Sequence, residues 1–346
     1  MADMMEHGMN RTAWLETQQL DYSQTLALGL YLILNGFLSG FLNLLGLGIF
    51  MIFYDILFNP SVLLEIGLIL ADLCVAGLHP FSGSAMLSNR WIWGPVGCQI
   101  YSFAGFLFGT FQLMITPAIA FDRYILTCKP SWNKHRTYKN YVKLFLAAFI
   151  VAVVCAGAPL IGWGTYAETP PGVSCTMDWT VVNSAYISFI TIYTVVSWVI
   201  PLTVTIFLYQ RIYKEHRRTK ARLDWCSPGS ELFVIIGSAL TTYLAFSIYG
   251  GVCVYPIIDD YQNIPKEMAV MPPVAAKFAG PFNAFFYLLC NPKYNACIKK
   301  LLGCQHDSRL IQRSDSLKEA RTVVKEAATV ESIQLAAVAG MSSERI

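Results

Sequence analysis

The sequence predicts an all-α membrane protein, a bundle of seven transmembrane helices. Of its 346 residues, 55% are hydrophobic and only 14% are charged, whereas a soluble domain carries about 25% charged residues. The charged residues occur in blocks, and the apolar runs between these blocks reach the ~20 residues that a helix needs to cross the hydrocarbon core. The formal charge of +3 gives no support for a nucleic-acid partner. The expected environment is therefore the lipid bilayer.

Five intervals of the chain contain no Asp, Glu, Lys or Arg, and each predicts one span. They lie between Asp21 and Asp55, Arg90 and Asp122, Lys143 and Glu168, Asp178 and Arg211, and Glu231 and Asp259. Two further apolar stretches, at about 62–86 and 268–290, have spanning length but contain charged residues. Lipid cannot form hydrogen bonds with unpaired peptide groups, so a spanning segment must be a helix or part of a closed β-barrel. The alternating ten-residue segments of a β-barrel are missing from the sequence. All seven spans are therefore expected to be helices.

The short loops predict the orientation of the bundle, which is expected at residues 24–290. Basic residues follow the third, fifth and seventh spans, whereas the opposite loops are poor in Lys and Arg. The basic side is therefore expected to be cytoplasmic, with the N-terminal segment 1–23 extracellular or lumenal. The basic residues are Lys129, Lys134, Arg136, Lys139, Arg211, Lys214, Arg217, Arg218, Lys220, Arg222, Lys293, Lys299 and Lys300.

The two ends of the chain carry candidate modification sites. Asn10 opens the sequon Asn10-Arg11-Thr12 on the expected outer side and is a candidate for glycosylation. Residues 291–304 place apolar residues opposite lysines at helical spacing, which predicts an amphipathic helix on the membrane surface. Cys304 at its end is a candidate for palmitoylation, an unmodified thiol being the alternative. Residues 305–346 are polar and are expected to form a disordered cytoplasmic tail.

Two of the ten cysteines stand apart from those inside the predicted spans. Cys98 opens the third span at its outer end, and Cys175 lies in the outer loop between spans four and five. Both are expected to face an oxidising compartment, where disulfides persist. A Cys98–Cys175 bridge that ties this loop over the mouth of the bundle is therefore predicted.

Lys277 is the candidate functional residue. It is the only charged residue between Glu267 and Lys293, in the middle of the seventh span, where a charge costs ~2.5–3.5 kcal/mol on insertion scales. One interpretation is a structural lysine that pairs with a carboxylate of the bundle or lines a transport path. The other is an amine that forms a Schiff base with an aldehyde ligand.

Several motifs between about residue 24 and about residue 304 resemble those of the opsins, a family of rhodopsin-like receptors. Lys277, followed by Asn283 and Tyr287, resembles the retinal-binding lysine and the end of the last opsin helix. Asp122-Arg123-Tyr124 resembles the receptor DRY triplet at the cytoplasmic end of span three. Asn43, Asp72 and Pro201 match the markers of spans one, two and five, and the Cys98–Cys175 pair fits the same pattern.

Two departures from the receptor pattern make the chain most similar to the retinal photoisomerase branch of that family, the retinochromes and the retinal G-protein-coupled receptor opsins. Ala284 replaces the proline that usually follows the last-helix asparagine. Counting back from Lys277, Phe246 and Ile248 stand where receptors have a tryptophan and a helix-bending proline. The resemblance implies covalently bound retinal as cofactor and a photoisomerase that converts all-trans-retinal to 11-cis-retinal. The alternatives are a light-activated receptor coupled to a heterotrimeric G protein and, more remotely, an ion pump or channel.

The same resemblance implies an apolar retinal pocket and raises the question of its counterion. The pocket residues are expected to be Tyr101, Gly105, Gly109, Thr110, Trp179, Tyr193, Trp198, Phe246 and Tyr249, although aromatic residues at helical spacing also serve plain packing. A buried cation needs an anion or a polar cage. Tyr101 occupies the span-three position that holds glutamate in vertebrate visual opsins, and Thr169 occupies the outer-loop acid position. Glu168, one residue earlier, is the counterion candidate.

Span two carries three polar residues that the family pattern does not explain together. Glu65, Asp72 and His79 are spaced seven apart, so that they project from one helix face. One hypothesis is that His79 titrates near the Schiff base; the other is an inward, hydrogen-bonded histidine without that role. No metal site is predicted.

Overall fold

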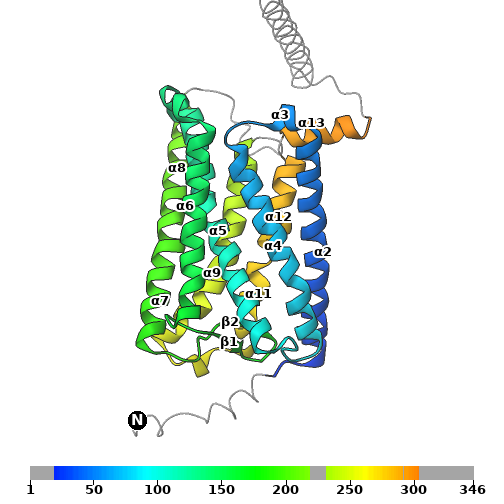
Figure 1. Cartoon of the computed structure of the whole chain (residues 1–346), viewed down its shortest axis with the longest axis vertical. Helices are drawn as coiled ribbons and strands as arrows, with labels where there is room; N and C mark the ends of the chain where they lie inside the picture. Colours follow the sequence, from blue (N-terminus) through cyan, green and yellow to red (C-terminus); the bar gives the residue numbers. More distant parts are fainter. Residues whose placement is uncertain (1–18, 219–230, 291, 304–346) are drawn as a thin grey trace, which may run out of the picture.

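The computed structural model describes residues 19–218, 231–290 and 292–303 and shows a bundle of long, nearly parallel helices (Figure 1). Within these residues, six helical segments are long and apolar enough to cross a membrane, which confirms the first six predicted spans. They are α2 (Tyr22–Ile52), α4 (Val62–Leu87), α5 (Gly94–Cys128), α6 (Tyr138–Gly157) with the 3₁₀ turn η2 (Ala158–Ile161), α7 (Ser184–Thr194) with the π-helical turn η3 (Val195–Val199) and α8 (Ile200–Arg218), and α9 (Glu231–Ile258).

The seventh span is present as a series of short helical segments. These are α10 (Lys266–Ala269), α11 (Met271–Ala276), α12 (Ala279–Phe285) and the π-helical turn η6 (Phe286–Cys290). Pro281 has no N–H, so the carbonyl of Lys277, four residues earlier, has no helical donor. On the other side of the lysine, the Phe278 N–H donates to the Ala275 carbonyl at 3.0 Å, a hydrogen bond across three residues and not the four of an α-helix. The helix is thus interrupted at the buried lysine.

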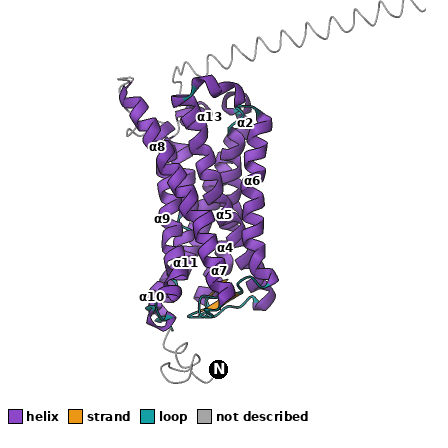
Figure 2. Cartoon of the chain, turned by 90° about the vertical axis from the view of Figure 1, so that its left-hand side faces the viewer, coloured by secondary structure: helices purple, strands orange, loops and turns teal. Residues whose placement is uncertain are grey.

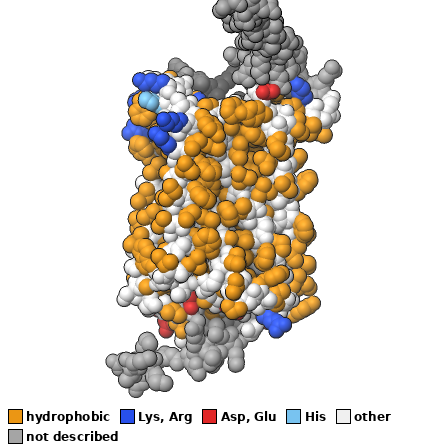
Figure 3. Space-filling view, in the orientation of Figure 1, with side chains coloured by type: hydrophobic (Ala, Val, Ile, Leu, Met, Phe, Trp, Pro, Cys, Tyr) orange, Lys and Arg blue, Asp and Glu red, His pale blue; other side chains and the backbone are white. Residues whose placement is uncertain are grey.

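The two ends of the bundle differ in structure and charge. At the end here named the hairpin end, β1 (Tyr166–Thr169) and β2 (Ser174–Met177) pair antiparallel, near the 3₁₀ turn η5 (Tyr261–Asn263) and α10 (Figure 2). At the opposite end, here named the basic end, lie α3 (Tyr54–Leu57), η1 (Pro130–His135) and α13 (Pro292–Leu301). On the face that Figure 3 shows, hydrophobic side chains cover the length of the bundle, and Lys and Arg gather mainly at the basic end.

The helix α13 confirms the predicted short helix after the last span. Its Tyr294 and Cys297 are buried against the bundle, whereas Lys299 and Lys300 are exposed. This is the two-sided pattern of a helix that lies on a membrane surface. Asn10, Cys304 and the tail after 304 lie outside the described residues.

Close packing of α2 against α4 brings polar groups of the two helices together. Gly36 allows this approach, because a Cβ added there would lie 2.5 Å from the Cβ of His79. Small residues serve the same purpose at many helix contacts in membranes, where backbones must come close. The neighbouring Asn35 therefore reaches His79 and the interrupted seventh span.

Candidate functional site

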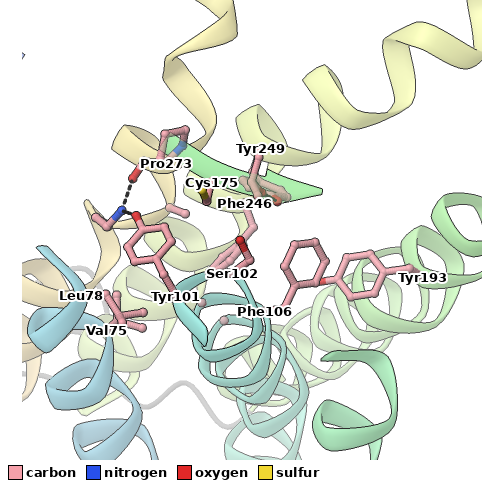
Figure 4. A pocket seen from close by; sticks show the side chains of 15 residues that line it. Val75, Leu78, Tyr101, Ser102, Phe106, Cys175, Tyr193, Phe246, Tyr249 and Pro273 are labelled. Carbon is pink, nitrogen blue, oxygen red and sulfur yellow. Dashed lines mark hydrogen bonds between the residues drawn. The ribbon is translucent and has the colours of Figure 1, made fainter. Parts of the chain in front are cut away.

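The amine of Lys277 is buried at the interruption between α11 and α12. The residue is 5% exposed. Its Nζ donates to the Tyr101 hydroxyl of α5 at 2.5 Å and to the Pro273 carbonyl at 3.3 Å. Figure 4 shows Tyr101 and Pro273 close together at one end of the cavity, with a dashed line for the hydrogen bond to the Pro273 carbonyl. The amine is therefore fixed between two oxygen acceptors, neither of which carries a negative charge.

The backbone of Lys277 is held from the other side by Asn35. The Asn35 Nδ2 donates at 2.9 Å to the Lys277 carbonyl that Pro281 leaves without a helical donor, and it lies 2.9 Å from His79 Nε2. Since the amide is the donor, Nε2 of His79 accepts, and its Nδ1–H donates to the Val75 carbonyl at 2.9 Å. His79 is thus an inward, neutral, hydrogen-bonded histidine.

A cavity opens from the Lys277 amine between α4, α5, α9 and β2. Its volume is about 70 Å³. A second apolar cavity of about 330 Å³ continues toward η3 and shares Phe106, Tyr193, Phe246 and Tyr249 with the first. The second cavity lies at the lower end of the ~300–1,000 Å³ of small-molecule pockets. Residues of the first cavity are Val75, Leu78, Tyr101, Ser102, Gly105, Phe106, Gly109, Cys175, Thr176, Tyr193, Phe246, Tyr249, Pro273, Ala276 and Lys277.

The predicted pocket residues divide into cavity walls and supporting residues. Tyr101, Gly105, Gly109, Tyr193, Phe246 and Tyr249 line the first cavity, and Trp198 lines the second. Thr110 lies behind the wall, where its hydroxyl is 3.0 Å from that of Tyr193. Trp179 is fully buried in the packed core but lines neither cavity. The sequence did not identify Ser102, Phe106 or Thr176, because nothing in their spacing distinguishes them from packing residues.

The β-hairpin covers the cavity at the hairpin end. The predicted disulfide between Cys98 of α5 and Cys175 of β2 is confirmed, with a Cα–Cα distance of 5.3 Å. The next residue, Thr176, hydrogen-bonds through its hydroxyl to Tyr249 of α9. The Gln99 amide donates to the Tyr166 carbonyl of β1 at 2.8 Å. The covalent bond and these hydrogen bonds join the hairpin to α5 and α9.

The structure does not bring Glu168 to Lys277. Glu168 is exposed on β1, opposite Cys175 in the strand register, and it does not line the cavity. Thr169, its neighbour, is buried, so the polar group turned inward at this point of the strand is a hydroxyl. Among the described residues no carboxylate lies within ion-pair distance of the Lys277 amine. The group at the amine is Tyr101.

The DRY-like triplet lies at the basic end in a network of ion pairs. Arg123 donates to Glu65 of α4 at 2.9 Å, and Arg136 donates to Asp122 at 2.8 Å. Tyr141 of α6 also donates its hydroxyl to Asp122. The Tyr124 ring stacks beside Phe121, with centroids 6.5 Å apart. The triplet therefore joins α5 to α4 and α6.

A buried polar cluster lies between the two ends. Gln112 donates to Asp72 at 2.7 Å, and Asn283 donates to the same carboxylate oxygen at 3.5 Å. The Asn283 carbonyl oxygen accepts from Ser238 of α9 at 2.7 Å. Tyr287 donates to Asn43 of α2 at 2.7 Å. The last-helix residues Asn283 and Tyr287 thus connect the seventh span to α2, α4 and α9.

Comparisons with known proteins agree with this arrangement. Residues 48–335 match the family described as 7 transmembrane receptor (rhodopsin family). The chain is similar to the human visual pigment-like receptor peropsin, 29% identical over 80% of this chain and 84% of that protein. It is also similar to the human RPE-retinal G protein-coupled receptor, 28% identical over 67% of this chain and 76% of that protein. The crystal structure of squid rhodopsin matches the fold with a TM-score of 0.71 at 20% identity, over 90% and 95% of the two chains.

Proposed function

Because the chain belongs to the rhodopsin family of seven-transmembrane receptors and is similar to opsins over most of its length, we propose that it is a retinal-binding opsin with Lys277 as the covalent attachment point. The observation that carries this proposal is a buried amine opening into an apolar, aromatic cavity. Retinal, when bound, supplies the absorption of visible light and the double bond that isomerises. The apolar walls fit a polyene and exclude water from the attachment point.

The protein's own residues have separate tasks in this proposal. Tyr101 and the Pro273 carbonyl orient the amine toward the cavity, and Asn35 fixes the backbone that carries it. Phe106, Phe246 and Tyr249 supply flat surfaces against which a long conjugated ligand packs. The proposed orientation places the basic end in the cytoplasm and the hairpin end outside.

The proposed reaction is the light-driven isomerisation of all-trans-retinal to 11-cis-retinal. It is supported by α9, which is one continuous helix over Glu231–Ile258 with its proline, Pro256, only near its end. Ile248, at the position of the receptor hinge proline, keeps its backbone donor and has an exposed side chain on the bundle surface. The absence of that bend favours a photoisomerase, whose main effect is on its ligand, over a signalling receptor that is activated by a movement of α9.

Illumination is expected to convert bound all-trans-retinal to the 11-cis isomer. The test is to load the purified full chain in the dark, illuminate it, extract the ligand and separate the isomers, with an unilluminated sample as control. A dark pigment that accepts only 11-cis-retinal would contradict the proposed direction. The second candidate function is a signalling receptor, which is supported by Asp122-Arg123 and by the cavity beside Arg123 and Glu65 at the basic end. Light-dependent nucleotide exchange on a G protein without net 11-cis production would favour this candidate.

Gly109→Ala is expected to lower the yield of pigment severalfold. A Cβ added at this position would lie 2.8 Å from the ring of Phe246, which lines both cavities. The ring must therefore shift and change the shape of the space proposed for the polyene, and such overpacking costs about 1–3 kcal/mol. The double variant with Phe246→Leu should recover the yield. Gly77→Ala is the control, because a Cβ there meets nothing within 4 Å. Equal yields for Gly109→Ala and Gly77→Ala would show that Phe246 does not bound the ligand.

A further inference from the structure

The segment that joins α5 to α6 carries a group of exposed basic residues at the basic end. Between Lys129 and Lys143 the chain contains no Asp or Glu. Five exposed basic residues, here named the η1 patch, lie from the end of α5 to the second turn of α6: Lys129, Lys134, His135, Lys139 and Lys143. In Figure 3, Lys and Arg side chains gather at one corner of this end, above α6 and α8 as labelled in Figure 1. This corner therefore presents positive charge to its surroundings.

The charge of the η1 patch is not balanced within the part of the chain that the structure describes. None of its four lysines has an ion pair or a side-chain hydrogen bond there. Arg136, in the same segment, differs, because it donates to Asp122 at 2.8 Å and to the Tyr141 hydroxyl at 3.2 Å. Asp122 is only 1% exposed, so its carboxylate serves Arg136 in the interior. The lysines outside are left to an external anion.

Two aromatic residues place the η1 patch at the depth of the lipid headgroups. Trp132 is 45% exposed and Tyr138 is 55% exposed, and both lie between the basic residues of the patch. Exposed Trp and Tyr next to membrane spans are typical of the interface, where an amphipathic ring contacts both the acyl chains and water. The first turn of α6 adds the partial positive charge of a helix N-terminus. The patch thus lies where lipid phosphates are found.

We propose that the η1 patch binds the headgroup of a polyphosphorylated inositol lipid in the surrounding leaflet. Clusters of about 4–8 basic residues beside a membrane span are typical of sites for anionic lipids. Several phosphatidylserine molecules would have to be gathered to neutralise the patch, whereas one headgroup with several phosphates contacts several lysines in a single binding event. Trp132 and Tyr138 favour a lipid over an acidic protein, because they place the lysines beside the lipid phosphates. The inference does not depend on retinal.

Lipid retention by the full chain provides the first test. The chain is incubated in detergent micelles with a phosphatidylinositol bisphosphate or with phosphatidylserine at equal total charge, and the retained lipid is counted by native mass spectrometry. The bisphosphate is expected to be retained about tenfold better or more. Lys134→Ala combined with Lys139→Ala should weaken its retention about tenfold or more, since each basic residue near anionic lipid contributes about a fivefold factor. Lys299→Ala combined with Lys300→Ala is the matched control, because it removes the same charge from exposed positions of α13 at the same end.

Hydrogen exchange locates the bound headgroup. In phosphatidylcholine discs, addition of the bisphosphate is expected to slow amide exchange in η1 and in the first turn of α6 but not in α13, because a bound ligand suppresses local opening. Equal protection of α13 would overturn the placement at η1.

The remaining outcomes decide between the lipid and other ligands. Equal retention of the two lipids would overturn the headgroup site and leave only a general attraction to anionic lipid. Equal losses in the two double variants would show that the η1 patch has no special role. Binding of free inositol trisphosphate as tight as that of the lipid would assign the patch to a soluble phosphate ester. Unchanged lipid retention in Lys134→Ala with Lys139→Ala, together with loss of G-protein binding, would assign it to an acidic protein. Specific retention by a chain that forms no pigment would uphold the lipid site while rejecting the proposed function.

Discussion

Lys277→Ala is expected to abolish all visible absorption of the retinal-treated protein while leaving the bundle folded. Among the residues that line the two described cavities, Lys277 has the only amine, and without an amine an aldehyde ligand has no nitrogen to bond. The fold should survive, because the substitution removes a buried cation that has no carboxylate partner among the described residues and leaves no charge unpaired. The melting temperature of the unliganded variant should therefore not fall below that of the parent chain.

Borohydride reduction followed by peptide mapping identifies the attachment site directly. The label is expected on Lys277 alone, and Lys277→Arg should be as colourless as the alanine variant although it keeps a positive charge. Lys266→Ala is the control, because its amine contacts the Gln19 carbonyl at the hairpin end, away from the cavity walls. Visible absorption in Lys277→Ala, or label on another lysine, would remove the basis of the photochemical proposal.

The spacing of polar residues on α4 predicted a shared face but not what that face contacts. Glu65, Asp72 and His79 lie two turns apart on one helix, which the sequence alone establishes. In the structure they reach three separate partners at three depths: Arg123 at the basic end, Gln112 in the middle and Asn35 beside the lysine. Helical periodicity determines which residues share a face, whereas the rotation and depth of the neighbouring helices determine their partners. The partners of this face are therefore determined by the folded arrangement of the helices and not by the spacing within α4.

The same distinction explains which parts of the site the sequence predicted. Lys277 was identified because a single cation in a long apolar run is costly, and the Cys98–Cys175 pair because both cysteines lie on the oxidising side. The interruption of the seventh span at Lys277 depends on Pro281 and on a donor from α2, Asn35. Ser102 looks like any small residue of a membrane helix until its hydroxyl is seen without a partner in the cavity.

Cys98→Ser and Cys175→Ser are each expected to reduce pigment formation to background at 37 °C. The bond closes a loop with a sequence separation of 77 residues, and loss of such a crosslink costs about 4–5 kcal/mol in the chain-entropy description. It also anchors β2, whose Cys175 and Thr176 form part of the cavity wall and whose Thr176 contacts Tyr249. Without the bond, the hairpin is free to leave the cavity, so that water reaches the amine.

The double variant separates loss of the bond from damage at either position. Since either single substitution breaks the same bond, Cys98→Ser combined with Cys175→Ser should be no worse than the poorer single variant, a non-additive result that is typical of directly coupled residues. Cys74→Ser, at an exposed free cysteine of α4, should form pigment like the parent chain. Pigment yield, thermal decay in the dark and the fraction of folded protein are measured for all four variants. Partial yields that multiply in the double variant would mean that the two cysteines act independently, and the hairpin would then be held over the cavity by its hydrogen bonds alone.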